Sequence, residues 1–243
     1  MIKLVSELIQ QRDAQTPGSL YYWTQILFSY NSNHLEGTQL TQDQTQELFE
    51  TGRLTTTTSI KFDDALETAN HFRAFDQILN TIDDPLSKQY IFDLHQILKG
   101  GTSQDWDPRY NVGGFKREAK MLTGQQLSTS AAEAPDQTIH LFCEWNRHQY
   151  TDLADFAAFH KRFEVIHPFS DGSGRIGRLL LFKELCRCGQ MPFFISSDRH
   201  TDYLDALAAY TADPGQLRHL FATEQQAYTQ AVLQLNALET TSK

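Results

Sequence analysis

The chain reads, at residues 167–178, His167-Pro168-Phe169-Ser170-Asp171-Gly172-Ser173-Gly174-Arg175-Ile176-Gly177-Arg178. Apolar residues recur on both sides of this stretch at spacings of three and four, which places them on one face of a helix. They are Leu153, Phe156, Phe159, Phe163 and Ile166 before the stretch, and Ile176, Leu179, Leu180 and Phe182 at its end and beyond. The pattern therefore predicts a glycine-containing loop that joins two helices and ends at the N-terminus of the second.

The residue types in this loop suit the binding of a polyphosphate. Gly172 and Gly174 can adopt backbone conformations that turn successive N–H groups toward an anion. The N-terminus of the following helix adds unpaired N–H groups and a partial positive charge. Arg175 and Arg178 lie three residues apart, so both guanidinium groups fall on one helical face and can grip phosphate oxygens.

Two further side chains of the loop supply chemistry. Asp171 offers the hard oxygen ligand that Mg²⁺ prefers, usually together with the phosphates of a substrate. His167 has an ordinary pKa close to neutrality, which suits a general base. A glycine turn can also be a plain connection in which Asp171 pairs with Arg175. The density of acid, base, glycines and arginines in twelve residues favours a nucleotide site instead.

The stretch resembles the signature of the Fic family, HxFx(D/E)GNGRxxR, with Ser173 at the usual asparagine position. This resemblance implies an all-α fold, a Fic-type helical bundle with a short β-hairpin flap near the active site. It also implies transfer of AMP from ATP, with Mg²⁺, to a Ser, Thr or Tyr hydroxyl of a target protein. Ser173 keeps a backbone N–H and a hydroxyl that can donate hydrogen bonds, so we expect activity to be retained.

The resemblance also implies roles for single residues. His167 would deprotonate the attacking hydroxyl, and Asp171 would hold Mg²⁺. Arg178 would reach the γ-phosphate, and Phe169 would belong to the nucleotide-binding motif as its core anchor. The cradle for the α- and β-phosphates would comprise Gly172, Ser173, Gly174 and Arg175.

A second motif lies near the N-terminus, where residues 32–38 read SNHLEGT. Ser32 and Glu36 are four residues apart, hence neighbours on a helix, and Gly37 is a plausible helix end. The motif resembles the inhibitory pattern (S/T)xxxE(G/N) of Fic proteins, which implies that Glu36 pairs with Arg178 and keeps it from the γ-phosphate. In some relatives this glutamate also aligns a water that removes AMP, so a bifunctional AMPylation and de-AMPylation enzyme remains an alternative.

Two further segments resemble parts of Fic proteins. Residues 113–124 are similar to the flap that binds the target's backbone as an added strand; the alternative is a basic surface hairpin. The residues that would form this flap contact are Phe115, Lys116, Met121 and Leu122. Residues 197–210 are similar to the helix whose tyrosine lies beside adenine, which indicates Tyr203 for that contact, with Tyr210 further along. A pair of tyrosines at helical spacing also fits an ordinary core.

Composition narrows the remaining choices. The 243 residues carry a net charge of −9, which argues against nucleic acid as a partner. No apolar run has the length of a membrane span, and the first residues lack the apolar segment of a signal peptide. Three cysteines, too few for a disulfide framework, indicate reduced thiols. These features predict a cytoplasmic protein without a membrane association.

We expect three regions: an N-terminal helical region carrying the inhibitory motif (1–60), a Fic core (61–215) and a C-terminal helix (216–243). The expected partners are ATP and an unidentified target protein, and whether the chain itself is a target stays open. Whether the chain forms a homo-oligomer stays open. Two other functions also stay open: a Fic enzyme that uses another phosphate-containing donor, and a catalytically weakened nucleotide-binding regulatory module.

Overall fold

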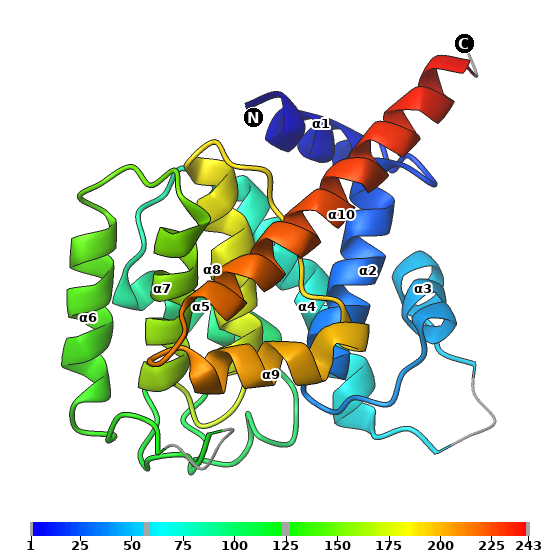
Figure 1. The fold of residues 1–243 in the computed structure, drawn as a ribbon. Coiled ribbons are helices and arrows are strands. Elements are labelled where there is room, and N and C mark those ends of the chain that lie inside the picture. The colour runs from blue at the N-terminus through cyan, green and yellow to red at the C-terminus, as the bar shows by residue number, and fades with distance from the viewer. Residues whose placement is uncertain (1, 56–58, 123–126, 242–243) are drawn as a thin grey trace.

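The structure, a computed structural model, describes residues 2–55, 59–122 and 127–241. Within these ranges it is built from ten α-helices and contains no β-sheet, so the all-α prediction is confirmed (Figure 1). The helices are α1 (Ile2–Asp13), α2 (Leu20–His34), α3 (Gln42–Thr51), α4 (Phe62–Asn80), α5 (Lys88–Lys99), α6 (Ala134–Trp145), α7 (Leu153–Ile166), α8 (Ser173–Arg187), α9 (His200–Ala209) and α10 (Gly215–Thr241). A short 3₁₀ turn, η2 (Ser197–Arg199), precedes α9.

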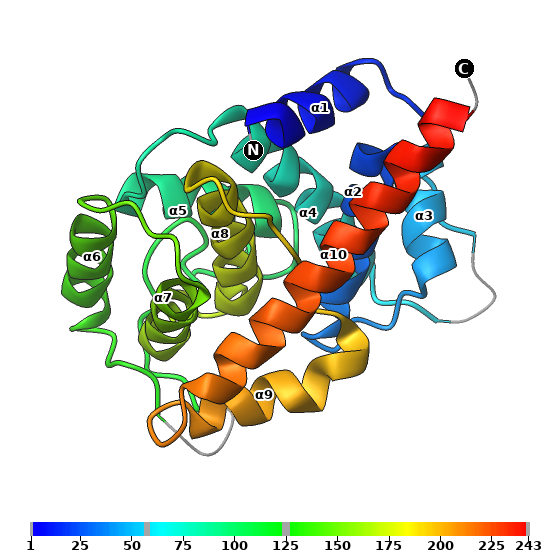
Figure 2. The ribbon, with the colours of Figure 1, turned by 45° about the horizontal axis from the view of Figure 1, so that its top comes forward.

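Helix α8 lies at the centre of the molecule and begins directly after the glycine loop (Figures 1 and 2). All of its residues from Ser173 to Cys186 are buried, because α2, α4, α5 and α7 pack around it. Phe182, for example, stacks on Phe28 of α2 and meets Phe75 of α4 edge to face. A helix surrounded in this way holds its N-terminus in a fixed position.

Helix α2 carries the N-terminal motif and is part of the core. Ser19 caps its start by accepting a hydrogen bond from the Tyr22 N–H (3.3 Å), as expected of a serine at this position. In its middle, Gln25 donates to the Phe72 carbonyl of α4 (3.1 Å). The chain turns after His34, and Gly37 takes the left-handed conformation with φ 91°. This turn brings the end of α2 beside the start of α8.

The long helix α10 crosses α7 and α9 and reaches back toward the N-terminal helices (Figures 1 and 2). Its Tyr228 hydroxyl lies 2.8 Å from the Thr24 hydroxyl of α2. Buried apolar residues from Leu4 to Val232 form one connected cluster. Across the described ranges, none of the helices is both long enough and apolar enough to cross a bilayer.

The flap-like segment runs along the C-terminal end of α7. The Lys116 N–H donates to the Pro168 carbonyl (2.8 Å), and the Thr129 N–H donates to the Val165 carbonyl (3.0 Å). Met121 and Leu127 form an isolated antiparallel bridge. The expected hairpin is therefore reduced to one bridge among the described residues. Residues 123 and 124 of the predicted flap lie outside the described residues.

Candidate active site

The loop between α7 and α8 is set by two residues in the left-handed conformation. His167 ends α7 with φ 47°, and its N–H donates to the Phe163 carbonyl (2.9 Å). Gly172 precedes α8 with φ 82°, a conformation that costs glycine little. A histidine at positive φ is strained, and such strain is concentrated at functional sites. The geometry turns the imidazole toward the start of α8.

His167 lines a cavity together with Gly174 and Arg178 of α8, so the structure brings the histidine and the second arginine of the signature to one space. Burial lowers the pKa of His167 to about 4, and the nearby charge of Lys116 contributes. The imidazole is therefore neutral at pH 7, the form that accepts a proton. Its Nδ1 has no hydrogen-bond partner within the described part of the chain.

Arg178 is held by the N-terminal motif. Its Nη2 lies 2.6 Å from Glu36 Oε1, and its Nε donates to the Ser32 hydroxyl (3.0 Å). Nη2 also donates to the Ser32 carbonyl (2.8 Å). Burial alone would raise the pKa of Glu36, but the charges of Arg178 and Arg175 outweigh burial and lower it. The carboxylate is ionised and paired at neutral pH.

Arg175 belongs to a buried cluster of four charges that the sequence did not reveal. Glu67 of α4 pairs with both Arg175 and Lys99, the last residue of α5. Asp171 Oδ2 lies 2.6 Å from Lys99 Nζ and 3.4 Å from Arg175 Nη2. Arg175 Nη1 also donates to Asn33 Oδ1 of α2 (3.2 Å). Two carboxylates and two cations thus neutralise each other beneath the loop.

The Asp171 carboxylate fits a role as a magnesium ligand only in combination with a substrate. Burial would raise its pKa, but Arg175 and Lys99 hold it well below the usual range, so the group is ionised. Its side chain is 35% exposed, so a metal could approach it. Among the described residues, no three His, Cys, Asp or Glu side chains gather as a metal site. Mg²⁺ bound to Asp171 would therefore take further ligands from the phosphate oxygens of the substrate, as it commonly does.

Two predicted nucleotide-binding residues face the interior of the loop. The Ser173 hydroxyl accepts a hydrogen bond from the Phe169 N–H (3.0 Å) and lies 3.3 Å from the Phe169 carbonyl. The Phe169 ring is fully buried and stacks on His95 at a centroid distance of 3.9 Å. Phe169 is thus a core anchor whose ring does not reach the cavity, and the Ser173 hydroxyl closes the loop.

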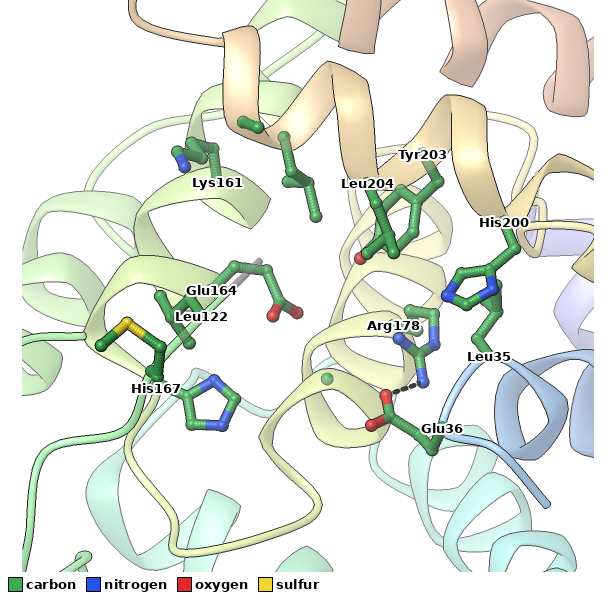
Figure 3. A pocket seen from close by; sticks show the side chains of 14 residues that line it. Leu35, Glu36, Leu122, Lys161, Glu164, His167, Arg178, His200, Tyr203 and Leu204 are labelled. Carbon is green, nitrogen blue, oxygen red and sulfur yellow. Dashed lines mark hydrogen bonds and ion pairs between the residues drawn. The ribbon is translucent and has the colours of Figure 1, made fainter. Parts of the chain in front are cut away.

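The cavity has a volume of about 230 Å³, below the 300–1,000 Å³ typical of small-molecule sites. The ion pair between Glu36 and Arg178 forms part of the cavity wall at the start of α8 (Figure 3). Tyr203 of α9 also lines the cavity, and its hydroxyl lies 2.7 Å from His160 Nε2. Its contact with adenine stays a prediction. Tyr210 lies instead in a separate surface hollow beside Ile166.

The flap-like segment contributes two apolar residues to the cavity and one buried anchor. Met121 and Leu122 are part of the cavity lining, and 68% of the Met121 surface is exposed. Lys116 is buried, with Nζ donating to the Ile166 carbonyl (2.7 Å) and the Ser128 hydroxyl (2.9 Å), so a basic surface hairpin is the wrong description. Phe115 packs edge to face on Phe92, 4.8 Å between centroids. These two residues fix the base of the flap.

Sequence reasoning missed several residues of the site. His95 accepts from the Gly113 N–H (3.1 Å) and lies 3.0 Å from the Asp171 carbonyl. It therefore ties the flap to the signature loop. Glu164 lies one helical turn before His167 and lines the same cavity. Its spacing of three from His167 was a usable signal, since i and i+3 share a helical face.

The fold and the site define an all-helical protein whose central helix begins with a glycine loop beside a histidine and two arginines. A model of the Fic/DOC family matches residues 85–185, which include the flap and the signature. Fic-1 of Caenorhabditis elegans, named a protein adenylyltransferase, is 26% identical over 206 residues, covering 80% of this chain and 38% of that protein. The protein adenylyltransferase Fic of Nematostella vectensis is 29% identical over 190 residues, covering 73% of this chain and 41% of that protein. The chain thus spans roughly two fifths of the length of these relatives.

Solved structures share the fold. A Fic domain containing signaling protein from Bacteroides thetaiotaomicron superposes with a TM-score of 0.76 at 24% identity, covering 96% of this chain and 97% of that one. A fragment of C. elegans Fic-1 gives 0.74 at 21% identity, covering 96% and 71%. These likenesses establish the fold alone. The Fic/DOC family model, which matches residues 85–185, identifies this part of the chain as similar to that family.

Proposed function

We propose that the chain is a protein adenylyltransferase that transfers AMP from ATP to a Ser, Thr or Tyr hydroxyl of a target protein. The observation that carries this proposal is the cavity shared by His167, Gly174 and Arg178 at the N-terminus of the central helix. The relatives named protein adenylyltransferase support it.

His167 is the general base of the proposed reaction. The target hydroxyl oxygen attacks the α-phosphorus, the bond from that phosphorus to the oxygen bridging the β-phosphate breaks, and pyrophosphate leaves. The hydroxyl proton passes to the imidazole, which is neutral at pH 7 because its pKa is about 4. Burial of the ring keeps water from competing for this position.

The start of α8 and the arginines bind the triphosphate. The unpaired N–H groups of the first turn face the α- and β-phosphates, where the helix dipole favours negative charge. Arg175, held in place by Glu67, adds a fixed guanidinium. Mg²⁺, when bound with ATP, would be held by Asp171 and the phosphates and would neutralise charge on the leaving group.

Glu36 keeps the enzyme at low activity in this proposal. Arg178 donates to the Glu36 carboxylate and to Ser32, so the same N–H groups are not available to a γ-phosphate. The carboxylate would also repel that phosphate. Transfer of AMP from ATP then requires the ion pair between Glu36 and Arg178 to open.

Removal of AMP from modified targets is a second candidate activity. It is favoured by one observation: the Glu36 carboxylate and His167 line the same cavity. A water between these groups could be aligned by the carboxylate for attack on a phosphodiester. Loss of label from a pre-modified target, seen with wild type and lost with Glu36→Gly, tests this activity.

The test of the proposed function uses ATP labelled at the α-phosphate, Mg²⁺ and a cell lysate. Glu36→Gly protein should transfer label to one or more proteins, whereas Glu36→Gly/His167→Ala should not. ATP labelled at the γ-phosphate serves as the donor control, because phosphate transfer would retain that label. If target proteins are labelled only by ATP that carries the label on its γ-phosphate, the enzyme transfers phosphate and not AMP. If folded protein binds no nucleotide, the proposed function is wrong.

A further inference from the structure

The carboxyl group of Glu164 is not used in the reaction described above. Glu164 lies on α7, three residues before His167, and lines the same cavity. Its side chain is largely buried, with 14% of its surface exposed. The carboxyl group faces the middle of the cavity, between His167 and Tyr203 (Figure 3).

One carboxyl oxygen of Glu164, Oε1, is buried against Gly177 of α8 and makes no hydrogen bond within the described ranges. His160 Nε2 is 3.7 Å away and lies 2.7 Å from the Tyr203 hydroxyl instead. Burial raises the pKa of Glu164 to about 7, although the charge of Arg178 opposes this shift. An unpartnered polar group of this kind is costly in the core of a protein and typical of a binding site.

The helix opposite Glu164 makes room for this carboxyl group. A Cβ atom added at Gly177 of α8 would lie only 2.8 Å from Glu164 Oε1. Any other residue at position 177 would therefore displace the side chain. Gly177 thus leaves room for Oε1 against α8, and the exposed part of the Glu164 side chain belongs to the cavity wall.

Glu36, Gly174 and Arg178 line the cavity at the start of α8. Apolar lining residues lie on both sides of Glu164, with Leu122 on the His167 side and Leu204 on the Tyr203 side (Figure 3). A nucleotide with its phosphates at α8 and its base beside Tyr203 and Leu204 would put its sugar near Glu164. A carboxylate has four acceptor positions, which suits a pair of sugar hydroxyls, and nucleotide-binding folds use an acidic residue in this way.

We propose that Glu164 accepts hydrogen bonds from the ribose hydroxyls of the nucleotide and so selects ribonucleotides over deoxyribonucleotides. This inference rests on the proposed function, because it takes ATP as the ligand of the cavity. It adds a sugar site that the signature does not contain. Glu164 is a specificity-determining residue in this account, since it touches the substrate away from the reacting phosphorus.

The test measures the affinity of Glu36→Gly protein for ATP, 2′-deoxy-ATP, 3′-deoxy-ATP and 2′,3′-dideoxy-ATP with Mg²⁺ by titration calorimetry. We expect ATP to bind roughly tenfold more tightly than the dideoxy analogue, since the analogue lacks both hydroxyl donors of the sugar. In Glu36→Gly/Glu164→Val, the affinity for ATP should fall to that of the dideoxy analogue, and the affinity for the analogue should not change. Glu164→Gln, which keeps one acceptor oxygen, should retain part of the preference.

The matched control is Asp155→Asn, which removes an exposed carboxylate from the same helix. It should leave the preference intact. Equal binding of ATP and the dideoxy analogue by Glu36→Gly, or a preference that survives Glu164→Val, overturns the sugar site while the proposed function stands. An equal loss of both nucleotides in Glu164→Val also overturns it, because the residue would then act through Arg178 or packing. If folded protein binds neither nucleotide, the proposed function fails and this inference with it.

Discussion

Arg178 and Glu36, which are 142 residues apart in the sequence, form an ion pair of 2.6 Å at the N-terminal end of the central helix. The Ser32 hydroxyl and carbonyl accept two further hydrogen bonds from the same guanidinium. One arginine of the signature is therefore satisfied on three sides by the end of α2. The activity of the protein should depend on how firmly this contact is made.

Substitution of Glu36 should raise AMP transfer. Glu36→Gly frees Arg178 for the γ-phosphate, and we expect a rise of roughly 10- to 100-fold, the range of a coupling free energy between two sites. Incorporation of label from α-labelled ATP measures it. Glu36→Asp keeps the charge on a shorter side chain and should give a smaller rise. Equal rates for Glu36→Gly and wild type would contradict the inhibitory role.

Glu67 should be a determinant of stability, because it is the shared partner of two buried cations. Glu67→Ala leaves Lys99 and Arg175 with only Asp171 between them. We expect the free energy of unfolding to fall by about 3 kcal/mol, as when one partner of a buried ion pair is removed. Urea unfolding measures this change. Glu118→Ala, on an exposed side chain, is the control and should leave the midpoint in place.

The pH dependence of transfer should reflect the depressed pKa of His167. The neutral imidazole is the active base, so activity is present above the pKa of about 4 and lost below it. Removal of Glu36 does not raise this pKa, because the Glu36 charge acts in the opposite direction. The kcat/KM of Glu36→Gly/Glu164→Gln, which lacks the other titrating carboxyl group of the cavity, should therefore stay flat from pH 8 to about 5.5, where an ordinary histidine would already lose about tenfold. A fall centred near 6.5 would count against this assignment.

Lys116 should stabilise the flap and have little effect on the affinity for ATP. Its buried ammonium group joins the flap to the end of α7 through the Ile166 carbonyl and the Ser128 hydroxyl. In Lys116→Met, backbone amides of residues 116–122 should exchange hydrogen faster, and labelling of targets should fall more than ATP affinity. Lys120→Met is the control on the same segment. Slow exchange in both variants would show that the lysine does not anchor the flap.

The signature loop and its two helices could be predicted from the sequence because their information is local. Apolar spacing marks the helices, and the glycines mark the loop. The contact between Glu36 and Arg178 could also be predicted, because the N-terminal motif resembles the inhibitory pattern of Fic proteins. Ser173 was the exception in the loop: its hydroxyl bonds to Phe169, which no spacing rule indicates.

The buried charge cluster could not be predicted, because its members come from three separate helices and the loop. Glu67 and Lys99 each resemble an ordinary charged residue of an amphipathic helix, and Arg175 was assigned to the phosphates. Only packing of α4 and α5 against α8 turns these side chains inward and makes them partners. The burial of Lys116 could not be predicted for the same reason, since a lysine in a polar segment is usually exposed.

The construction of α2 limits how the chain could be switched on. Phe28 and Gln25 of this helix are buried against α4 and α8, so the segment that carries Ser32 is also a structural support of the whole bundle. Deleting it should give an insoluble or unfolded product, not a constitutively active one. The turn at residues 35–38 carries Glu36 and lies outside α2, so a movement of this turn can open the ion pair between Glu36 and Arg178 while α2 stays in place.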